Sequence, residues 1–174
     1  GRSVLVMTDS LTRLAMAQRQ IGLSAGEPPT SKGYPPSVFT LLPRLLERGG
    51  KGVDGSGSIT SISTVLIEAD DINDPIGDTV RSIVDGHIVL SRRLVSYGHY
   101  PPVDVLESLS RTMPYTVSKE HLDAATEVRR IMAIYSENEE LIRLGAYKRG
   151  TDPTVDMSIQ LKDDIDAFLR QGRE

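Results

Sequence analysis

The sequence predicts an α/β fold, the later part of a sheet without its first strands, followed by a small all-helical domain. Apolar runs of strand character alternate with helical patterns up to about residue 114, an order that is typical of α/β sheets. Beyond Met113-Pro114 the strand signals disappear. The chain also enters a buried-type run at Val4, with no flanking element before it. We therefore predict two domains, residues 1–114 and 115–174, in a fragment whose N-terminal partner strands are missing.

The first element is the apolar run Val4-Leu5-Val6-Met7, which ends abruptly in Asp9 and Ser10. A run that is apolar without alternation predicts a strand buried on both faces. Asp9 would then lie at the carboxyl end of this strand, where open parallel sheets bind their ligands. A carboxylate there is the Walker B arrangement, which holds the magnesium that bridges nucleotide phosphates. The alternative, that Asp9 or Ser10 only caps the next helix, stays open from this stretch alone.

Helical patterns follow this strand. Apolar residues at helical spacing predict helices over about 11–21 and 37–46, the second of them kinked at Pro43. A loop rich in Pro and Gly, residues 27–36, joins the two helices. A flexible tip rich in glycine, residues 49–57, comes after the second.

The rest of the first domain contains two further strand patterns. The longest β-branched run, residues 59–67, predicts a strand that ends at Glu68. Asp74-Pro75 then supplies an N-cap and a first-turn proline for a helix. His87-Ile88-Val89-Leu90 predicts a short buried strand, and a further helix is expected over about 91–97.

The predicted C-terminal domain contains four helices. Ser136-x-x-Glu139 is a capping box that predicts the start of the second, and Gly145 is expected to end it. Asp152-Pro153 begins the third. Apolar residues define the faces of the first and fourth helices: Leu122, Ala125, Val128, Met132 and Tyr135 in the first, and Ile165, Phe168 and Leu169 in the fourth.

Composition narrows the class of protein. Lys+Arg number 20 and Asp+Glu 24, so the formal net charge is −4 and no sequence-independent binding to nucleic acid or anionic lipid is implied. The chain has no cysteine, which excludes disulfides and thiolate metal sites. No apolar run approaches the roughly 20 residues of a membrane span, and no signal peptide opens the chain. We expect a soluble, cytoplasmic protein.

The glycine-rich tip does not match a phosphate-binding loop. Gly50 and Gly55 have the spacing of G-x-x-x-x-G, but Ser56 follows where the motif requires Lys. The segment also precedes a strand, whereas a phosphate-binding loop follows one. The sequence therefore contains no Walker A motif.

Four further residues, at three places in the chain, could serve a nucleotide site. Tyr100 lies in a loop after a strand-helix pair, where its ring could stack on a base, or could only pack on Pro101. Arg111 stands at the domain edge, where a guanidinium could reach a phosphate bound to a neighbouring subunit, or could only form a surface ion pair. Asp70-Asp71 could bind a metal, although capping and loop roles are favoured.

The histidines do not suggest a second kind of site. His87 is predicted to be a strand residue with a satisfied ring, and His99 and His121 are predicted to be exposed. No pair of histidines has the spacing of metal ligands, and no Ser-His-Asp order stands out.

Several motifs of the chain occur in this order in one family. The chain resembles the C-terminal part of the flagellar and type III secretion export ATPases, relatives of the catalytic subunits of rotary ATP synthases. The match covers essentially all 174 residues. The motifs are VLVMTDSLTR (4–13), GEPP (26–29), GYPPSVF (33–39), GSIT (57–60), DGHIVLSR (85–92), HYPPVD (99–104), SR (110–111) and GAYKRGTDP (145–153).

The resemblance implies the second half of a RecA-like P-loop NTPase sheet and a helical C-terminal domain. Asp9 matches the Walker B carboxylate that holds Mg²⁺ through water, and Arg13 matches a position near the phosphates. Tyr34 matches an aromatic residue that lines the same cleft. Tyr100 matches the ring that stacks on adenine, and Arg111 matches the arginine finger that is donated across the hexamer interface.

The same resemblance implies a homohexameric ATPase that couples hydrolysis of Mg²⁺-bound ATP to the export of flagellar proteins. Its partners would be the export apparatus, export substrates and chaperones, with peripheral contact to the membrane export gate at most. The Walker A residues and the catalytic glutamate should lie before Gly1, so the chain alone is expected to be inactive. Thr8 and Gln20 stand where many members carry a hydrophobic residue and Glu, and neither departure removes a charge that the chemistry needs.

Two alternatives stay open. The first is the injectisome ATPase of virulence secretion, which these motifs hardly separate from the flagellar enzyme. The second is a non-catalytic module, whose helical domain binds chaperone or substrate while the nucleotide half only assembles rings. A rotary ATP synthase subunit is disfavoured, because the sequences of residues 33–39 and 86–90 resemble those of the export branch more closely.

Overall fold

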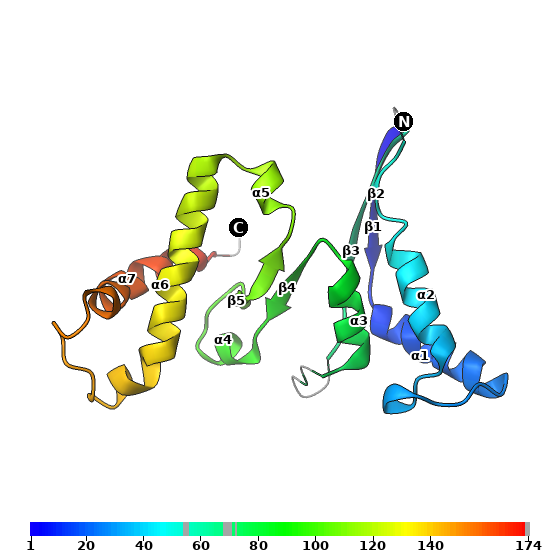
Figure 1. Ribbon diagram of the computed structural model, residues 1–174, viewed down its shortest axis with the longest axis horizontal. Helices are drawn as coiled ribbons and strands as arrows, with labels where there is room; N and C mark the ends of the chain where they lie inside the picture. The colour runs from blue at the N-terminus through cyan, green and yellow to red at the C-terminus, as the bar shows by residue number, and fades with distance from the viewer. Residues whose placement is uncertain (54–55, 68–70, 72, 173–174) are drawn as a thin grey trace. The chain divides into compact units, whose positions relative to one another are not determined.

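The computed structural model describes residues 1–53, 56–67, 71 and 73–172. The chain divides into two compact units, Gly1–Val84 and Asp85–Glu174 (Figure 1). The domain boundary that the sequence suggests, between residues 114 and 115, stays a prediction. Strands and helices mix in both units, which confirms the α/β class.

The first unit contains a three-stranded sheet with the order β1-β3-β2. β1 (Arg2–Thr8) and β3 (Gly57–Ser63) are parallel and in register from Arg2 opposite Gly57 to Thr8 opposite Ser63. β2 (Gly50–Lys51) pairs antiparallel with the other side of β3, inside the segment that was predicted to be a flexible tip. Parallel strands need a long crossover, which the helices between β1 and β3 supply.

The buried core of the first unit lies among its helices. α1 (Leu11–Ser24), α2 (Pro36–Leu46) and α3 (Pro75–Ile83) confirm the predicted helices, and α2 continues through Pro43. Asp74 caps α3, since its Oδ1 accepts hydrogen bonds from the amides of Ile76 (3.0 Å) and Gly77 (2.8 Å). The buried cluster consists of Leu11, Ala15, Tyr34, Val38, Leu42, Ile76 and Val80.

The prediction that the first strand is buried on both faces is wrong for this structure. Val4 is 48% exposed, Leu5 58% and Met7 74%. A continuous apolar run predicts layers on both faces of a sheet, whereas the buried cluster of this unit is built from helices and the loop before α2.

The second strand ends earlier than predicted. β3 stops at Ser63, and Glu68, its predicted end, lies outside the described residues. After Ser63 the backbone turns toward the start of α1: the amide of Leu11 donates to the carbonyl of Thr64 (3.0 Å), and the amide of Leu66 donates to Thr12 Oγ1 (2.8 Å). The β-branched composition of residues 59–67 does not reveal these longer-range hydrogen bonds, so the length of the strand was overestimated.

The second unit opens with an antiparallel pair, β4 (Gly86–Leu90) and β5 (Val103–Ser110), joined through the short helix α4 (Arg92–Ser96). The strand at 87–90 is confirmed, but it is not buried, because Ile88 is 74% exposed and Leu90 65%. β5 was not predicted. Its register is irregular, so its side chains do not alternate cleanly along the sequence.

The remainder of the second unit is helical. α5 (Met113–Thr116) is short, α6 (Lys119–Arg143) is a single helix, and α7 (Pro153–Leu169) packs against α6. The predicted helix start at Ser136 is therefore wrong, as is a separate fourth helix around Ile165. A capping box requires a non-helical N-cap, whereas the helical pattern continues through Ser136 without a Gly or Pro to break it.

The predicted ends around this helical pair are confirmed. Gly145 follows α6 with φ 68°, the left-handed conformation that glycine adopts at helix C-termini, and Asp152 caps α7. Among the helices that the structure describes, none is both long and apolar enough to cross a membrane.

Candidate nucleotide site

Asp9 lies directly after β1, and its carboxylate is exposed. Its Oδ1 accepts a hydrogen bond from Thr64 Oγ1 at 2.7 Å. Thr64 follows β3, the parallel neighbour of β1, so the carboxyl ends of two adjacent strands bring these side chains together. The helix-capping role belongs to Ser10, whose side chain accepts from the amide of Arg13 at 3.3 Å. Asp9 is therefore a strand-end carboxylate, not the cap of α1.

The oxygens at this strand end suit magnesium. Mg²⁺ prefers oxygen ligands, keeps several waters, and is commonly held by one or two carboxylates together with substrate phosphates. Asp9 offers an exposed carboxylate beside the hydroxyl of Thr64. No cluster of three or more acidic or histidine side chains that could hold a metal occurs in the described parts of the chain. A single carboxylate would fit magnesium that is bound together with a nucleotide.

Arg13 and Tyr34 both lie in the first unit, in different surroundings. Arg13 is exposed in the first turn of α1. Tyr34 is buried, with 7% exposure, and its ring makes an edge-on contact with Phe39 at 6.4 Å between centroids. The guanidinium of Arg19 lies 5.4 Å from the centre of the Tyr34 ring. Sequence reasoning missed Arg19, which α1 presents toward the loop that carries Tyr34.

Asp71 forms loop contacts, as predicted, while its neighbour Asp70 lies outside the described residues. Its carboxylate forms an ion pair with Lys32 and accepts a hydrogen bond from the amide of Asn73 at 2.9 Å. The hydrogen bond from Lys32, followed by that from the Asn73 amide, lowers the pKa of Asp71 from its usual value. Asp71 thus stays ionised to lower pH in the folded state.

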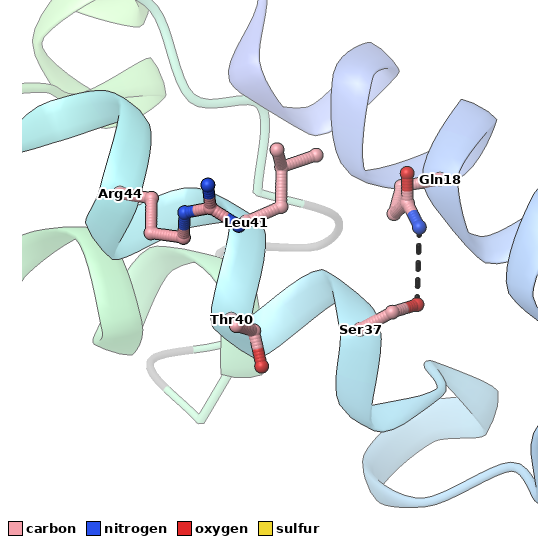
Figure 2. A pocket seen from close by; sticks show the side chains of 5 residues that line it. All are labelled: Gln18, Ser37, Thr40, Leu41 and Arg44. Carbon is pink, nitrogen blue, oxygen red and sulfur yellow. Dashed lines mark hydrogen bonds between the residues drawn. The ribbon is translucent and has the colours of Figure 1, made fainter.

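A surface pocket of about 320 Å³ lies between α1 and α2 (Figure 2). Gln18 of α1 donates to Ser37 Oγ of α2 across one side of it, at 3.1 Å. Its lining consists of Gln18, Ser37, Thr40, Leu41 and Arg44, and none of the residues predicted for the nucleotide site is among them.

Tyr100 lies in the loop between α4 and β5 of the second unit. Its side chain is 50% exposed, and its carbonyl accepts a hydrogen bond from the amide of Gln171 at 2.9 Å. The ring is therefore accessible on a loop whose backbone is held by the C-terminal segment. His99, predicted to be exposed, is 6% exposed, because the chain after Gly98 folds back and the His99 amide donates to the carbonyl of Leu94 at 3.0 Å.

Arg111 follows β5 directly. Its amide donates to the carbonyl of Asp85 at 2.8 Å, and its side chain is exposed. The ring of His87, on β4, contacts the carbonyl of Glu107 at 3.0 Å, which confirms the prediction of a satisfied strand histidine. The backbone of Arg111 is thus held by its hydrogen bond to Asp85, the residue directly before β4.

The predicted site residues fall into two groups. Asp9, Arg13 and Tyr34 belong to the first unit, and Tyr100 and Arg111 belong to the second. Sequence reasoning missed Thr64 beside Asp9. A usable signal existed, because the β-branched run 59–67 is long enough to place a hydroxyl at the end of a strand parallel to the first.

Known families match both parts of the chain. The nucleotide-binding domain of the ATP synthase alpha/beta family matches residues 1–110, and the T3SS EscN ATPase C-terminal domain matches residues 117–174. The flagellum-specific ATP synthase of Bacillus subtilis (strain 168) is 53% identical over the whole chain, which covers 39% of that relative. The SPI-2 type 3 secretion system ATPase of Salmonella typhimurium is also 53% identical over the whole chain, which covers 40% of it.

Solved structures agree with these relatives. The assembled ATPase EscN from the type III secretion system of enteropathogenic E. coli matches with a TM-score of 0.91 and 51% identity, over 97% of this chain and 40% of that one. The chain thus spans about two fifths of the length of the curated relatives it matches. By both sequence and structure, it belongs to the ATP synthase alpha/beta family, in the branch of the flagellar and type III secretion export ATPases.

Proposed function

We propose that a longer protein carrying these residues, called here the full-length subunit, hydrolyses ATP in a homohexameric ring and couples hydrolysis to the export of flagellar proteins. The observation that carries the proposal is the exposed Asp9 carboxylate at the end of β1, beside Thr64. The names of the relatives support it, because they are flagellum-specific ATP synthases and type 3 secretion system ATPases. The likeness to an assembled EscN ATPase supports a ring.

Each predicted site residue has a role in this proposal. Asp9 would hold Mg²⁺ through water, and the metal would supply positive charge beside the nucleotide phosphates. Arg13 lies near the phosphates and Tyr34 borders the same cleft. Tyr100 stacks on adenine, and Arg111 of a neighbouring subunit stabilises the charge that develops on the transferred phosphoryl group.

The partners and location of the full-length subunit form part of the proposal. We infer that it works in the cytoplasm with the export apparatus, export substrates and chaperones, and reaches the membrane export gate only peripherally. A solved structure of EscN in complex with its central stalk EscO, with a TM-score of 0.84, supports assembly with other secretion components.

Phosphate release is the direct test. We expect the full-length subunit to release phosphate from ATP in the presence of Mg²⁺, and to stop when Mg²⁺ is chelated. The 174-residue chain alone should show no turnover, because its sequence contains no phosphate-binding loop. Turnover by the chain alone would refute the prediction that hydrolysis requires a phosphate-binding loop from outside these 174 residues. A full-length subunit that assembles rings but releases no phosphate would favour the non-catalytic module instead.

Tyr100→Ala should weaken ATP binding in the full-length subunit. Stacking of a base on an aromatic side chain contributes about 1–3 kcal/mol, so we expect KM for ATP to rise about 10-fold with little change in kcat. Tyr100→Phe keeps the ring and should behave as wild type. Tyr115→Ala removes another exposed tyrosine, 89% exposed, and serves as the control. Equal KM values for Tyr100→Ala and Tyr115→Ala would contradict the stacking role.

An injectisome client is the second candidate, because relatives of both names are 53% identical to this chain. Deleting the gene in its own organism separates the two. The flagellar proposal predicts loss of extracellular flagellin and of swimming, with other secreted effectors unchanged. Loss of effector secretion in cells that still swim would assign the subunit to an injectisome.

A further inference from the structure

The pairing of β5 with β4 is interrupted shortly before Arg111. His87 stands opposite Leu109, and Val89 stands opposite Asp104. Residues 105–108 of β5 therefore face only Ile88 of β4 and form a bulge. Backbone groups in such a bulge lose their strand partners, and buried carbonyls without partners are costly.

Side chains form hydrogen bonds with the carbonyls of this bulge. Arg129 of α6 binds most of them: Nη1 donates to the carbonyls of Val105 (2.5 Å) and Ser108 (3.1 Å), and Nη2 donates to that of Leu106 (3.2 Å). The ring of His87 contacts the remaining carbonyl, that of Glu107, at 3.0 Å. Arg129 thus ties the irregular part of β5 to helix α6.

Two amides of the bulge are satisfied from within β5. Asp104 Oδ1 accepts from the amides of Leu106 and Glu107, both at 3.1 Å. The hydroxyl of Ser108 accepts from the amide of Val89 on β4 at 2.9 Å. The bulge is therefore a defined turn, in which all four carbonyls and the amides of Leu106 and Glu107 have hydrogen-bond partners.

Neighbouring arginines on α6 differ in what they bind. Arg129 is half-buried and directs its guanidinium to another element. Arg130 is exposed and pairs with Glu127 of its own helix, at 2.6 Å. A planar guanidinium can donate to several carbonyls at once, which the single ammonium of lysine cannot reproduce with the same geometry. The pair therefore offers a test residue and its matched control.

The anchored bulge leads straight into Arg111. Ser110 stands opposite Gly86, and the amide of Arg111 donates to the carbonyl of Asp85 at 2.8 Å. A side chain at Gly86 would place its Cβ 2.7 Å from the carbonyl oxygen of Leu109, so the two strands approach closely there. The end of β5 is thus held by β4 on one side, and its preceding bulge is held by α6.

We propose that Arg129 is a positioning residue, which sets the direction of Arg111 by fixing the bulge of β5. This inference rests on the proposed function, in which Arg111 acts on ATP bound to a neighbouring subunit. Displacing a catalytic group by about 1 Å can cost on the order of 100-fold in rate, so a residue without contact to ATP can still control turnover.

Kinetics of the full-length subunit test the proposal. Arg129→Lys should lower kcat about 10- to 100-fold and leave KM for ATP near wild type, because binding does not require Arg111 to be oriented. Arg130→Lys should leave both constants unchanged. In the double variant with Arg111→Ala, Arg129→Lys should cause no further loss, because its effect passes through Arg111. Additive losses would overturn the inference.

Hydrogen exchange supplies a readout besides activity. In the full-length subunit, peptides that cover residues 103–112 should exchange faster in Arg129→Lys than in Arg130→Lys, while peptides from α1 stay unchanged. If Arg129→Lys does not fold, His87→Ala removes only the contact to the Glu107 carbonyl and should lower kcat in the same direction by a smaller factor. Wild-type kcat and exchange in His87→Ala would then overturn the inference.

The outcomes separate this inference from the function on which it rests. If Arg111→Ala itself leaves turnover intact, the proposed role of Arg111 fails. If Arg111→Ala is inactive while Arg129→Lys matches its Arg130→Lys control, only the positioning role fails.

Discussion

Arg111→Ala should reduce kcat of the full-length subunit by about three orders of magnitude or more, since an arginine that stabilises a phosphoryl transition state contributes on the order of 10³ to 10⁵ in rate. KM for ATP should stay near wild type, because the guanidinium belongs to the neighbouring subunit and acts in the transition state. Arg111→Lys should recover little, because an ammonium lacks the planar fork. Arg92→Ala, at another exposed arginine of the same unit, is the control.

Rings that contain two different variant subunits test whether Arg111 acts across the subunit interface. A subunit with Arg111→Ala still offers an intact Asp9, and a subunit with Asp9→Ala still donates an intact Arg111. Co-assembly of the two inactive variants should restore turnover at those interfaces where the intact residues meet. No recovery in rings shown to contain both variants, or loss of ATP binding in Arg111→Ala, would place Arg111 in the site of its own subunit.

Asp9→Ala should also abolish most turnover, for a different reason. The carboxylate lies exposed at the end of β1, and its proposed role is to hold the hydrated Mg²⁺ that accompanies ATP. Because such a metal contributes several kcal/mol to stabilising the transition-state charge, we expect kcat to fall by roughly 10³-fold. The Mg²⁺ concentration required for half-maximal rate should rise, which steady-state assays over a magnesium series can measure.

Thr64→Val is the matched control for Asp9. It removes the hydroxyl that donates to Asp9 Oδ1 at 2.7 Å and keeps the carboxylate. A net hydrogen bond contributes about 1 kcal/mol, so the loss in rate should be no more than about 5-fold. If Asp9→Ala showed unchanged turnover and an unchanged magnesium requirement, the Walker B role would be refuted. A subunit that assembled rings without any turnover, with or without Asp9, would be a non-catalytic module.

Local signals predicted those elements whose ends depend on neighbouring residues. Asp74 caps α3 and Asp152 caps α7, each through amides within three positions along the chain. Gly145 ends its helix through its own left-handed backbone. In contrast, β5 was not predicted because a bulge interrupts its register with β4 and its side-chain alternation, and that bulge is held by Arg129, more than twenty positions away. The helix start predicted at Ser136 was wrong because a capping box is a motif of only four residues, whereas a helix is stabilised by the packing of its whole apolar face.

The site was predictable where a strand end and a polar residue coincide. Asp9 follows a continuous apolar run, so its place at the carboxyl end of β1 follows from the sequence. Its partner Thr64 is 55 positions away, and the contact depends on the parallel register of β1 and β3. Arg19 was missed for the same reason, since its contact with Tyr34 is made across space between a helix and a loop.

The bare faces of the first sheet affect how this chain behaves in solution. β1 is an outer strand in the order β1-β3-β2, and Leu5 and Met7 are 58% and 74% exposed. Outer strands with accessible apolar side chains template intermolecular pairing. Preparations of the 174-residue chain should therefore self-associate as concentration rises and bind hydrophobic dyes, and a charged substitution such as Met7→Lys should improve recovery from expression.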